Sequence, residues 1–289
     1  MHFAPPPPRC PECHSLKSVK RGIRKTKAAP RQLYKCKKCG RHFSLAPLPG
    51  YNYPVRAVLT APVLYYTGYS LPKVRQHIAA RYHLDPSVST VHSWIKRFGK
   101  YAGLKKERTQ MIKAYTPRRL IYKKAVAPAQ SFNLRVHQYK LDHCTDKAPG
   151  IRRYLTSLME GKLVIKREWL ALNASQVELG LSLPVYKPDD TYVAKMTDLA
   201  LKLSWSNYQR HGLLEHFFLV MDSATIACEV PVYLTGKETR SILGMKGGLS
   251  GYIDMLQVRD KKVYITDYKP ASHLGKNAVD QLLVYSLAL

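Results

Sequence analysis

The chain has 289 residues, 45% hydrophobic content and a formal net charge of +28 at pH 7. This length allows two or three small domains with real cores, and so large a charge excludes an ordinary balanced surface. No apolar run reaches about 18 residues and prolines occupy positions 5–8, so we expect no transmembrane helix, no membrane association and no signal peptide.

The positive charge is confined to one half of the chain. Residues 1–150 carry 30 Lys and Arg against 5 Asp and Glu, whereas residues 151–289 carry 17 against 14. A polycation of this kind is typical of nucleic-acid binding, because each neutralised phosphate releases counterions. A basic proteome is the alternative, but it does not explain the asymmetry. We therefore expect DNA as the partner, duplex and also single-stranded, in the cytoplasm of a prokaryotic or infected host cell.

The first forty residues contain two Cys-x2-Cys pairs separated by 22 residues. The four cysteines are Cys10, Cys13, Cys36 and Cys39. Two such turns can close four thiolates around Zn2+, and the basic segment between them cannot form a core without a metal. An iron–sulfur cluster is the alternative, and His14 and His42 are spare ligands expected on the surface. Residues 9–45 resemble the zinc ribbon at the start of some insertion-sequence transposases.

Residues 51–101 show three short helical patterns. Apolar residues recur at helical spacing over 55–66, Ser70 precedes a second pattern around Val74 and Ile78, and Ser89 or Thr90 is expected to cap a third. The third pattern buries Trp94 and places polar and basic side chains outward: His92, Ser93, Lys96, Arg97 and Lys100. This segment resembles the recognition helix of transposase and recombinase helix-turn-helix domains, which implies DNA contact through that outward face. A plain three-helix domain is the alternative.

Residues 103–149 are basic and show little periodicity, so we expect a linker that follows phosphates. Beyond it, residues 151–218 are mostly helical in pattern, including one segment over 193–214. Strands are expected over 226–234, 251–258 and 263–269, the last two forming a hairpin, with a final helix over 277–289.

The hairpin places Asp254 on one strand and Asp267 on its neighbour, with Lys269 on the same face two residues later. Two carboxylates and an ammonium at a sheet edge would be costly if merely buried. A divalent metal removes that cost by using the carboxylates as ligands, while the lysine orients a water. The pattern therefore indicates phosphodiester hydrolysis. A surface Asp and an ordinary ion pair are the alternative interpretation.

These residues, followed by Gln281 and Tyr285 in a Q-x3-Y arrangement, resemble the PD-(D/E)xK nucleases of the RecB-like branch, which includes the CRISPR adaptation exonucleases. The resemblance implies that Asp254, Asp267, the backbone carbonyl of Tyr268 and an upstream histidine bind Mg2+ or Mn2+, and that Lys269 positions the nucleophile. The histidine is His216 in a Gly-x3-His setting, with His211 as its rival. Gln281 and Tyr285 would brace the site or contact DNA, and a direct role for Glu229 is not favoured.

The chain departs from that branch in two respects. Cys144 and Cys228 are isolated, so no iron–sulfur cluster is expected in the nuclease half. The strand that usually follows the Q-x3-Y helix is not found before Leu289, so either the strand is dispensable, or a homo-oligomer or partner protein supplies it, or the sequence is a shortened form.

The expected architecture is multidomain α+β. It comprises a zinc ribbon over 1–48, a helix-turn-helix domain over 49–102, the linker over 103–149 and a restriction-endonuclease-like core over 150–289, with a mixed sheet flanked by helices. We predict a metal-dependent deoxyribonuclease from a mobile element, virus or defence system. The rival hypotheses are a transposase or transposase-derived protein, a non-catalytic DNA-binding regulator, and a nuclease that acts on RNA.

Overall fold

The computed structural model describes residues 8–24, 31–44, 53–126, 132–144, 148–163, 171–180, 191–203, 210–269 and 277–289. They form a mixed α+β fold with a three-stranded and a six-stranded sheet. Among these residues, no helix combines the length and the apolar character that crossing a membrane requires.

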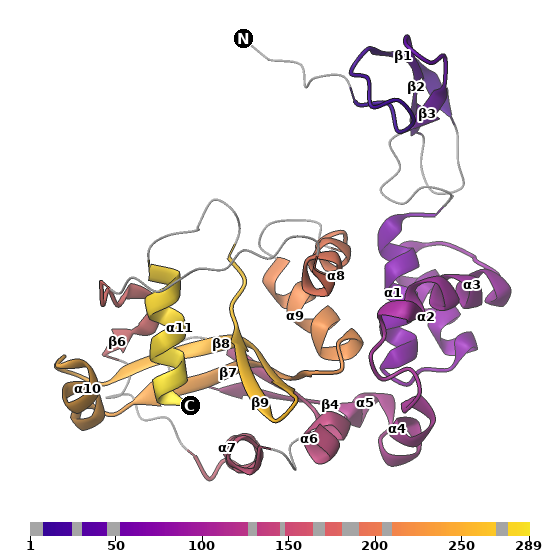
Figure 1. Cartoon of the computed structure of the whole chain (residues 1–289). Coiled ribbons are helices and arrows are strands. Elements are labelled where there is room, and N and C mark those ends of the chain that lie inside the picture. The colour runs from indigo at the N-terminus through magenta and orange to yellow at the C-terminus, as the bar shows by residue number, and fades with distance from the viewer. Residues whose placement is uncertain are drawn as a thin grey trace.

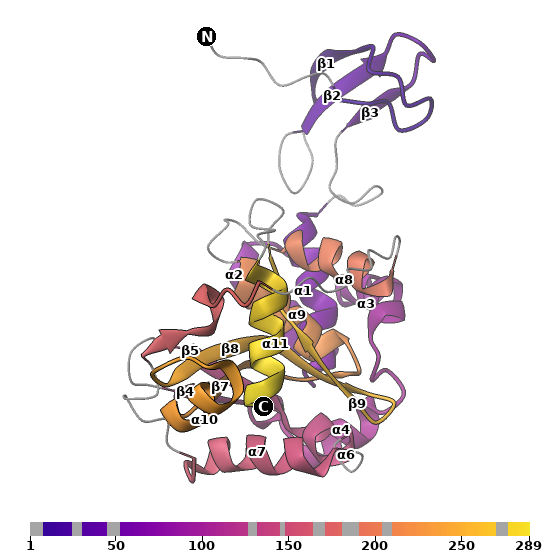
Figure 2. The same ribbon diagram turned by 60° about the vertical axis from the view of Figure 1, so that its left-hand side comes forward.

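The small sheet contains β1 (Ser18–Arg24), β2 (Arg31–Cys36) and β3 (His42–Ser44), paired antiparallel in that order. In both views it stands apart from the other helices and strands (Figures 1 and 2). Its buried hydrophobic residues are only Cys10, Cys36 and Phe43 in the described part of the chain. So small an apolar core leaves most of the stabilisation to the cysteines and what they bind.

Three helices follow: α1 (Val55–Tyr66), α2 (Leu71–Tyr82) and α3 (Val88–Phe98), the last continuing into the 3-10 turn η1 (Gly99–Tyr101). The helical pattern over 55–66 and the start of α2 after Ser70 are confirmed. The expected cap at Ser89 or Thr90 is wrong, because the Ser87 hydroxyl accepts a hydrogen bond from the Thr90 amide at 3.1 Å. A cap accepts from the amide three residues later, so α3 begins at Val88.

The segment that was expected to be a linker is folded. It forms α4 (Arg108–Ala114), α5 (Pro117–Leu120), β4 (Ile121–Val126), β5 (Phe132–His137) and α6 (Gln138–Cys144). β5 pairs with β7 through Arg135 and Val136, opposite Cys228 and Ala227. The linker interpretation is wrong here because the partner strand lies about ninety residues further along the chain, where no local pattern reveals it.

The large sheet is built around two long strands, β7 (Thr225–Leu234) and β8 (Leu249–Arg259). Its order is β4-β5-β7-β8-β6, and β9 (Lys262–Thr266) also pairs with β8. All pairs are antiparallel except that of β8 with the short β6 (Leu172–Asn173). Asp260 and Lys261, both with positive φ, form the tight turn between β8 and β9.

The hairpin register matters for the candidate site. Met255 pairs with Thr266 and Leu256 with Ile265, so the next position along brings Asp254 opposite Asp267. The β9 strand ends at Thr266, which is earlier than the strand predicted over 263–269. Asp267 therefore lies just beyond the ladder, on the loop that leaves the sheet.

Five helices and a 3-10 turn surround this sheet. They are α7 (Pro149–Glu160), η4 (Ala174–Gln176), α8 (Tyr192–Leu201), α9 (Arg210–Met221), α10 (Gly236–Leu243) and α11 (Asn277–Ala288). The helix predicted over 193–214 is therefore two helices. α9 packs against β7 and α1, so it lies between the sheet and the first three helices (Figure 1).

The hydrophobic core extends across the predicted domain boundaries. Buried residues of α1–α3 form one cluster with those of α8 and α9, and Cys228 and Met255 of the sheet belong to it. A second cluster joins β5, β7 and β8 to α7 and α11. The helices α1–α3 and the large sheet are thus held together through α9.

Candidate functional site

The four cysteines near the N-terminus form a group that can hold a metal ion. Their sulfur atoms all lie within 4.8 Å of one another. The Sγ atoms of Cys10 and Cys39 are 3.5 Å apart, as are those of Cys13 and Cys36. Four thiolates at Zn–S distances of about 2.3 Å around one ion give sulfur–sulfur separations close to these values.

Two tight turns create this arrangement. The His14 amide donates to the Cys10 carbonyl oxygen at 3.0 Å, and the Gly40 amide does the same to that of Cys36 at 3.0 Å. Gly40 has φ +74, a conformation that glycine adopts without strain. Hydrogen bonding from the backbone of Cys39 lowers the pKa of Cys36 to about 6, which favours the thiolate that a metal requires.

Helix α3 presents the predicted polar face to solvent. Val91, Trp94, Ile95 and Phe98 are buried, and the side chain of Trp94 meets Tyr53 edge to face with ring centroids 5.0 Å apart. The five residues on the outward side are all exposed: His92, Ser93, Lys96, Arg97 and Lys100. Lys100 follows α3 in η1, with its ammonium 5.1 Å from the centre of the Tyr101 ring.

A second metal-capable group lies where α9 meets β8. Ligand atoms of His211, Glu215 and Asp254 all fall within 4.8 Å of one another. His211 and Glu215 are four residues apart on α9 and so share one helix face. The His211 Nδ1 atom is 3.5 Å from Asp254 Oδ2, and this contact raises the pKa of His211 above its ordinary value.

The loop after β9 completes the surroundings of Asp254. The Tyr268 amide donates to Asp254 Oδ2 at 2.8 Å, and the Tyr268 ring meets that of His211 at a centroid distance of 5.1 Å. The predicted metal ligand was the carbonyl of Tyr268, whereas the contact in the structure is made by its amide. Tyr268 therefore fixes the carboxylate orientation, and the role of its carbonyl stays a prediction.

Asp267 and Lys269 form an ion pair beside this group. Lys269 Nζ is 2.8 Å from Asp267 Oδ2, and the Asp267 side chain is only 7% exposed. Burial raises the pKa of Asp267, and the negative charge of nearby Asp254 raises it further. The two aspartates thus interact electrostatically, but Asp267 lies outside the group of three whose ligand atoms are mutually close.

Glu215 and Arg135 were not predicted from the sequence. Arg135 of β5 makes an ion pair with the Glu215 carboxylate, donates to the Gly212 carbonyl oxygen at 3.1 Å, and lies 3.7 Å from Glu229. Burial raises the pKa of Glu215 to about 8; the Arg135 charge opposes this shift, and Asp254 and Glu229 add to it. The spacing of His211 and Glu215 is the signal that could have revealed the glutamate.

Glu229 has a structural part in the same cluster. It sits in β7 with φ +51, a conformation unusual for a residue other than glycine. Its Oε2 atom accepts from the Asn133 amide at 3.2 Å. Glu229 thus joins β5 to β7 and adds negative charge near Glu215.

His216 is not part of the metal-capable group. It follows Glu215 directly on α9 and so points about 100° away around the helix axis. Burial lowers its pKa to about 4, and the charges of Arg135 and Lys123 lower it further. His216 lines a separate cavity on another side of α9. The structure therefore places His211, the rival in the sequence prediction, where His216 was expected.

Gln281 and Tyr285 brace the sheet from α11. The Gln281 side-chain amide donates to the Tyr285 hydroxyl, and both residues are buried. The Tyr285 ring covers Gly251 of β8 so closely that an added Cβ there would lie 2.3 Å from a ring carbon. Burial raises the pKa of Tyr285 to about 12, and Asp267 and Asp254 contribute to this shift.

The arrangement brings acids, an imidazole and two cations into one partly buried cluster on β8, α9 and the β9 loop. One imidazole and two carboxylates could together hold a divalent metal ion, and Lys269 supplies a positive charge beside them. Comparisons with known protein families, with curated proteins and with solved structures found no match for this chain.

Proposed function

We propose that the chain is a divalent-metal-dependent nuclease that hydrolyses DNA phosphodiester bonds. The observation that carries this proposal is the convergence of His211, Glu215 and Asp254, with ligand atoms within 4.8 Å of one another. Asp267 and Lys269, joined by their 2.8 Å contact, lie next to them. The carboxylates and the lysine agree with the resemblance to PD-(D/E)xK nucleases, and the imidazole comes from His211.

The roles follow from the chemistry of the reaction. Mg2+ or Mn2+, when bound to the three ligands, supplies Lewis acidity toward a phosphodiester oxygen. Lys269 places positive charge where negative charge develops as water attacks. The water oxygen forms a bond to phosphorus, one P–O bond breaks, and the deoxyribose oxygen that leaves takes up a proton. Gln281 and Tyr285 hold the sheet beneath the site, and Asp267 orients Lys269.

The basic half would recruit the DNA. The exposed face of α3 carries Lys96 and Arg97, and its buried Trp94 fixes that helix against α1. A helix with this face can enter a major groove. We assign zinc to the four cysteines, as a structural ion that holds the small sheet together. A DNA-binding half joined to a nuclease suits a protein of a mobile element, a virus or a defence system.

Cleavage of circular and linear DNA tests the nuclease assignment. The protein is incubated with Mn2+ and linear duplex, circular duplex or circular single-stranded DNA, beside Asp254→Asn, Lys269→Ala and the control Asp260→Asn. Asp260 carries the same chemical change on an exposed turn of the same hairpin. We expect cleavage by the parent and the control, and at least a hundredfold loss in the other two, the order of effect that positioned charges have on such reactions.

Two outcomes would count against the proposal. Equal cleavage by Asp254→Asn would show that the group on α9 and β8 is not the site. DNA binding by the parent without any cleavage would favour a non-catalytic DNA-binding regulator. Cleavage of circles would identify endonuclease action, whereas degradation of linear DNA alone would identify an exonuclease.

Metal content tests the zinc assignment separately. Elemental analysis of the purified chain should find one zinc ion per chain, lost in Cys36→Ser and kept in Cys144→Ser. Cys144 is isolated in the sequence, far from both Cys-x2-Cys pairs. Iron with visible absorbance would indicate a cluster, and no metal in the parent would refute the assignment.

A further inference from the structure

A cavity of about 850 Å³ lies on the side of α9 that faces away from the candidate metal centre. It is enclosed by the end of α1, the segment from α4 to β4, the start of α6, and α9. Its volume lies within the range of pockets that hold small organic groups, about 300 to 1,000 Å³. Five basic and aromatic lining residues form the proposed site: Tyr69, Tyr115, Arg118, Arg119 and Lys123.

The cavity is strongly basic. Arg118, Arg119 and Lys123 are exposed at its wall, and no Asp or Glu is among its lining residues. Within the described residues, none of these three side chains makes a hydrogen bond or ion pair with the protein. Three unpaired cations around a concavity repel one another and focus a positive potential. An anion with several charged groups relieves that repulsion.

The tyrosines add an aromatic wall that is already fixed in place. The Tyr115 hydroxyl donates to the Asp142 carboxylate. The Tyr69 ring meets His77 edge to face at a centroid distance of 4.8 Å. Rings held in this way lose little freedom when a ligand stacks on them. Flat rings beside guanidinium groups are typical of sites that take nucleobases.

We propose that this pocket binds single-stranded nucleic acid, with backbone phosphates at Arg118, Arg119 and Lys123 and an unstacked base against the tyrosines. A duplex is a poor fit, because its bases are paired and stacked on each other and cannot lie against these rings. A strand is favoured over a nucleoside monophosphate because its backbone brings a phosphate to each of the three cations, whereas the mononucleotide carries one phosphate.

The pocket also has a defined relation to the candidate metal centre. His216 lines the pocket, and its neighbour Glu215 belongs to the metal-capable group. The pocket and the metal-capable group therefore share α9 but lie on different sides of it. Binding at the pocket does not require cleavage, so the two proposals can fail separately.

Fluorescence anisotropy with a labelled oligothymidine of twenty nucleotides tests the inference, without added divalent ions so that no cleavage can occur. The variant Arg118→Gln/Arg119→Gln is compared with Lys261→Gln/Lys262→Gln, which removes the same charge from the exposed hairpin turn. We expect at least tenfold weaker binding for the first and less than twofold for the second. Loss of two phosphate contacts should lower the salt slope of binding by about 1.4.

Tyr69 provides a charge-neutral test. Tyr69→Leu should weaken binding of the oligonucleotide about fivefold with the salt slope unchanged. Tyr69→Phe should bind the oligonucleotide as tightly as the parent does, because phenylalanine keeps the aromatic ring. Thermal unfolding of each variant checks that the fold is kept, and the same titrations with a labelled duplex provide the reference. Duplex binding should change less than twofold in every variant.

Three results would overturn the inference. One is equal weakening of single-stranded and duplex binding by the arginine variant, which would indicate general electrostatics. Another is a loss of oligonucleotide affinity in the arginine variant that is no greater than the loss in Lys261→Gln/Lys262→Gln. The third is binding of thymidine monophosphate as tight as that of the oligonucleotide, which would assign the pocket to a free nucleotide.

Discussion

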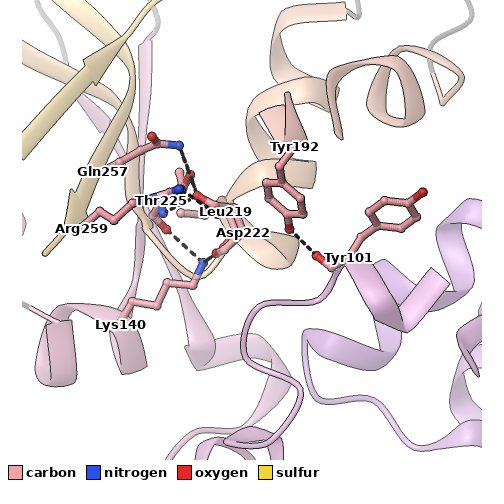
Figure 3. Close-up of polar contacts among 8 residues, drawn as sticks. All are labelled: Tyr101, Lys140, Tyr192, Leu219, Asp222, Thr225, Gln257 and Arg259. Atoms are coloured by element: carbon pink, nitrogen blue, oxygen red, sulfur yellow. Dashed lines mark hydrogen bonds and ion pairs between the residues drawn. The ribbon is translucent and has the colours of Figure 1, made fainter. Parts of the chain in front are cut away.

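Lys140 offers the sharpest test of how α9 is held in place. Its side chain is completely buried, although lysine is seldom buried at all. The ammonium donates to the carbonyl oxygens of Leu219 at 2.6 Å, Asp222, and Thr225 at 3.0 Å (Figure 3). These carbonyls lie at the end of α9 and the start of β7, where helix geometry leaves acceptors without partners.

The expected cost of Lys140→Met can be worked from these contacts. Methionine has nearly the same length but leaves three buried acceptors without a donor, at about 1–3 kcal/mol each. Relief from burying the ammonium offsets several kcal/mol of that loss. We therefore expect the free energy of unfolding to fall by about 3 kcal/mol, which is a summed loss of about 6 kcal/mol less about 3 kcal/mol of relief. This is a large part of a typical total of about 5–15 kcal/mol.

Urea denaturation followed by circular dichroism measures this change. Lys124→Met is the matched control, because Lys124 Nζ also donates to a helix carbonyl, that of Leu158 at 2.8 Å, but is only half-buried. Its loss should be about 1 kcal/mol or less. Lys113→Met, on the exposed side of α4, should lie within about 0.5 kcal/mol of the parent.

The comparison with Lys124→Met tests whether burial strengthens the contacts of Lys140. Equal losses in the two variants would mean that burial does not strengthen the contacts of Lys140. A variant Lys140→Met more stable than the parent would mean that the cost of burying the ammonium exceeds the value of its three hydrogen bonds. Either result would refute the argument.

Three further predictions concern the candidate centre. His211→Ala should weaken Mn2+ binding at least tenfold by titration calorimetry while His216→Ala leaves it unchanged; the reverse order would restore the original histidine assignment. Mn2+ affinity should rise with pH and level off only above pH 8, because Glu215, whose pKa is about 8, must lose a proton to become a ligand; a flat profile would contradict this. Gly251→Ala should lower stability by about 1–3 kcal/mol in urea denaturation, because the Tyr285 ring must move; an unchanged midpoint would show that the ring adapts freely.

Sequence patterns predicted the elements whose signals are local. The apolar spacing over 55–66 marked α1, and the change to alternation after residue 224 marked β7 and β8. The two Cys-x2-Cys turns were visible because their ligands lie close together within each pair. The opposition of Asp254 and Asp267 followed from the hairpin, whose register a tight turn fixes.

What the sequence missed depends on contacts between distant residues. Arg135 and Glu215 are 80 residues apart in the sequence, and only the folded structure shows that their side chains form a buried ion pair. The strands β4 and β5 carry charged residues such as Lys123 and Arg135, which are typical of a basic linker. Their place in the sheet becomes evident only when β5 is seen to pair with both β4 and β7. Which of His211 and His216 faces Asp254 depends on how α9 is rotated about its own axis against β8. The apolar pattern of a mostly buried helix does not specify that rotation.

The two metal-capable groups differ in how their charges are balanced, and this difference has a consequence for folding. Around Asp254, the four carboxylates of Glu215, Glu229, Asp254 and Asp267 meet Arg135, Lys269 and a histidine whose pKa is raised. Much of the negative charge is therefore already compensated by protein cations, and the large sheet and α9 bury a full hydrophobic core around it.

The four cysteines have no such support. Only Phe43 accompanies Cys10 and Cys36 as a buried hydrophobic residue in the described part of the small sheet. Ordering the chain there costs about 1–2 kcal/mol per residue in backbone entropy, which so few apolar contacts cannot offset. We therefore propose that metal binding at the four cysteines supplies most of the folding free energy of β1–β3, whereas the cluster on α9 and β8 can form before any cation binds.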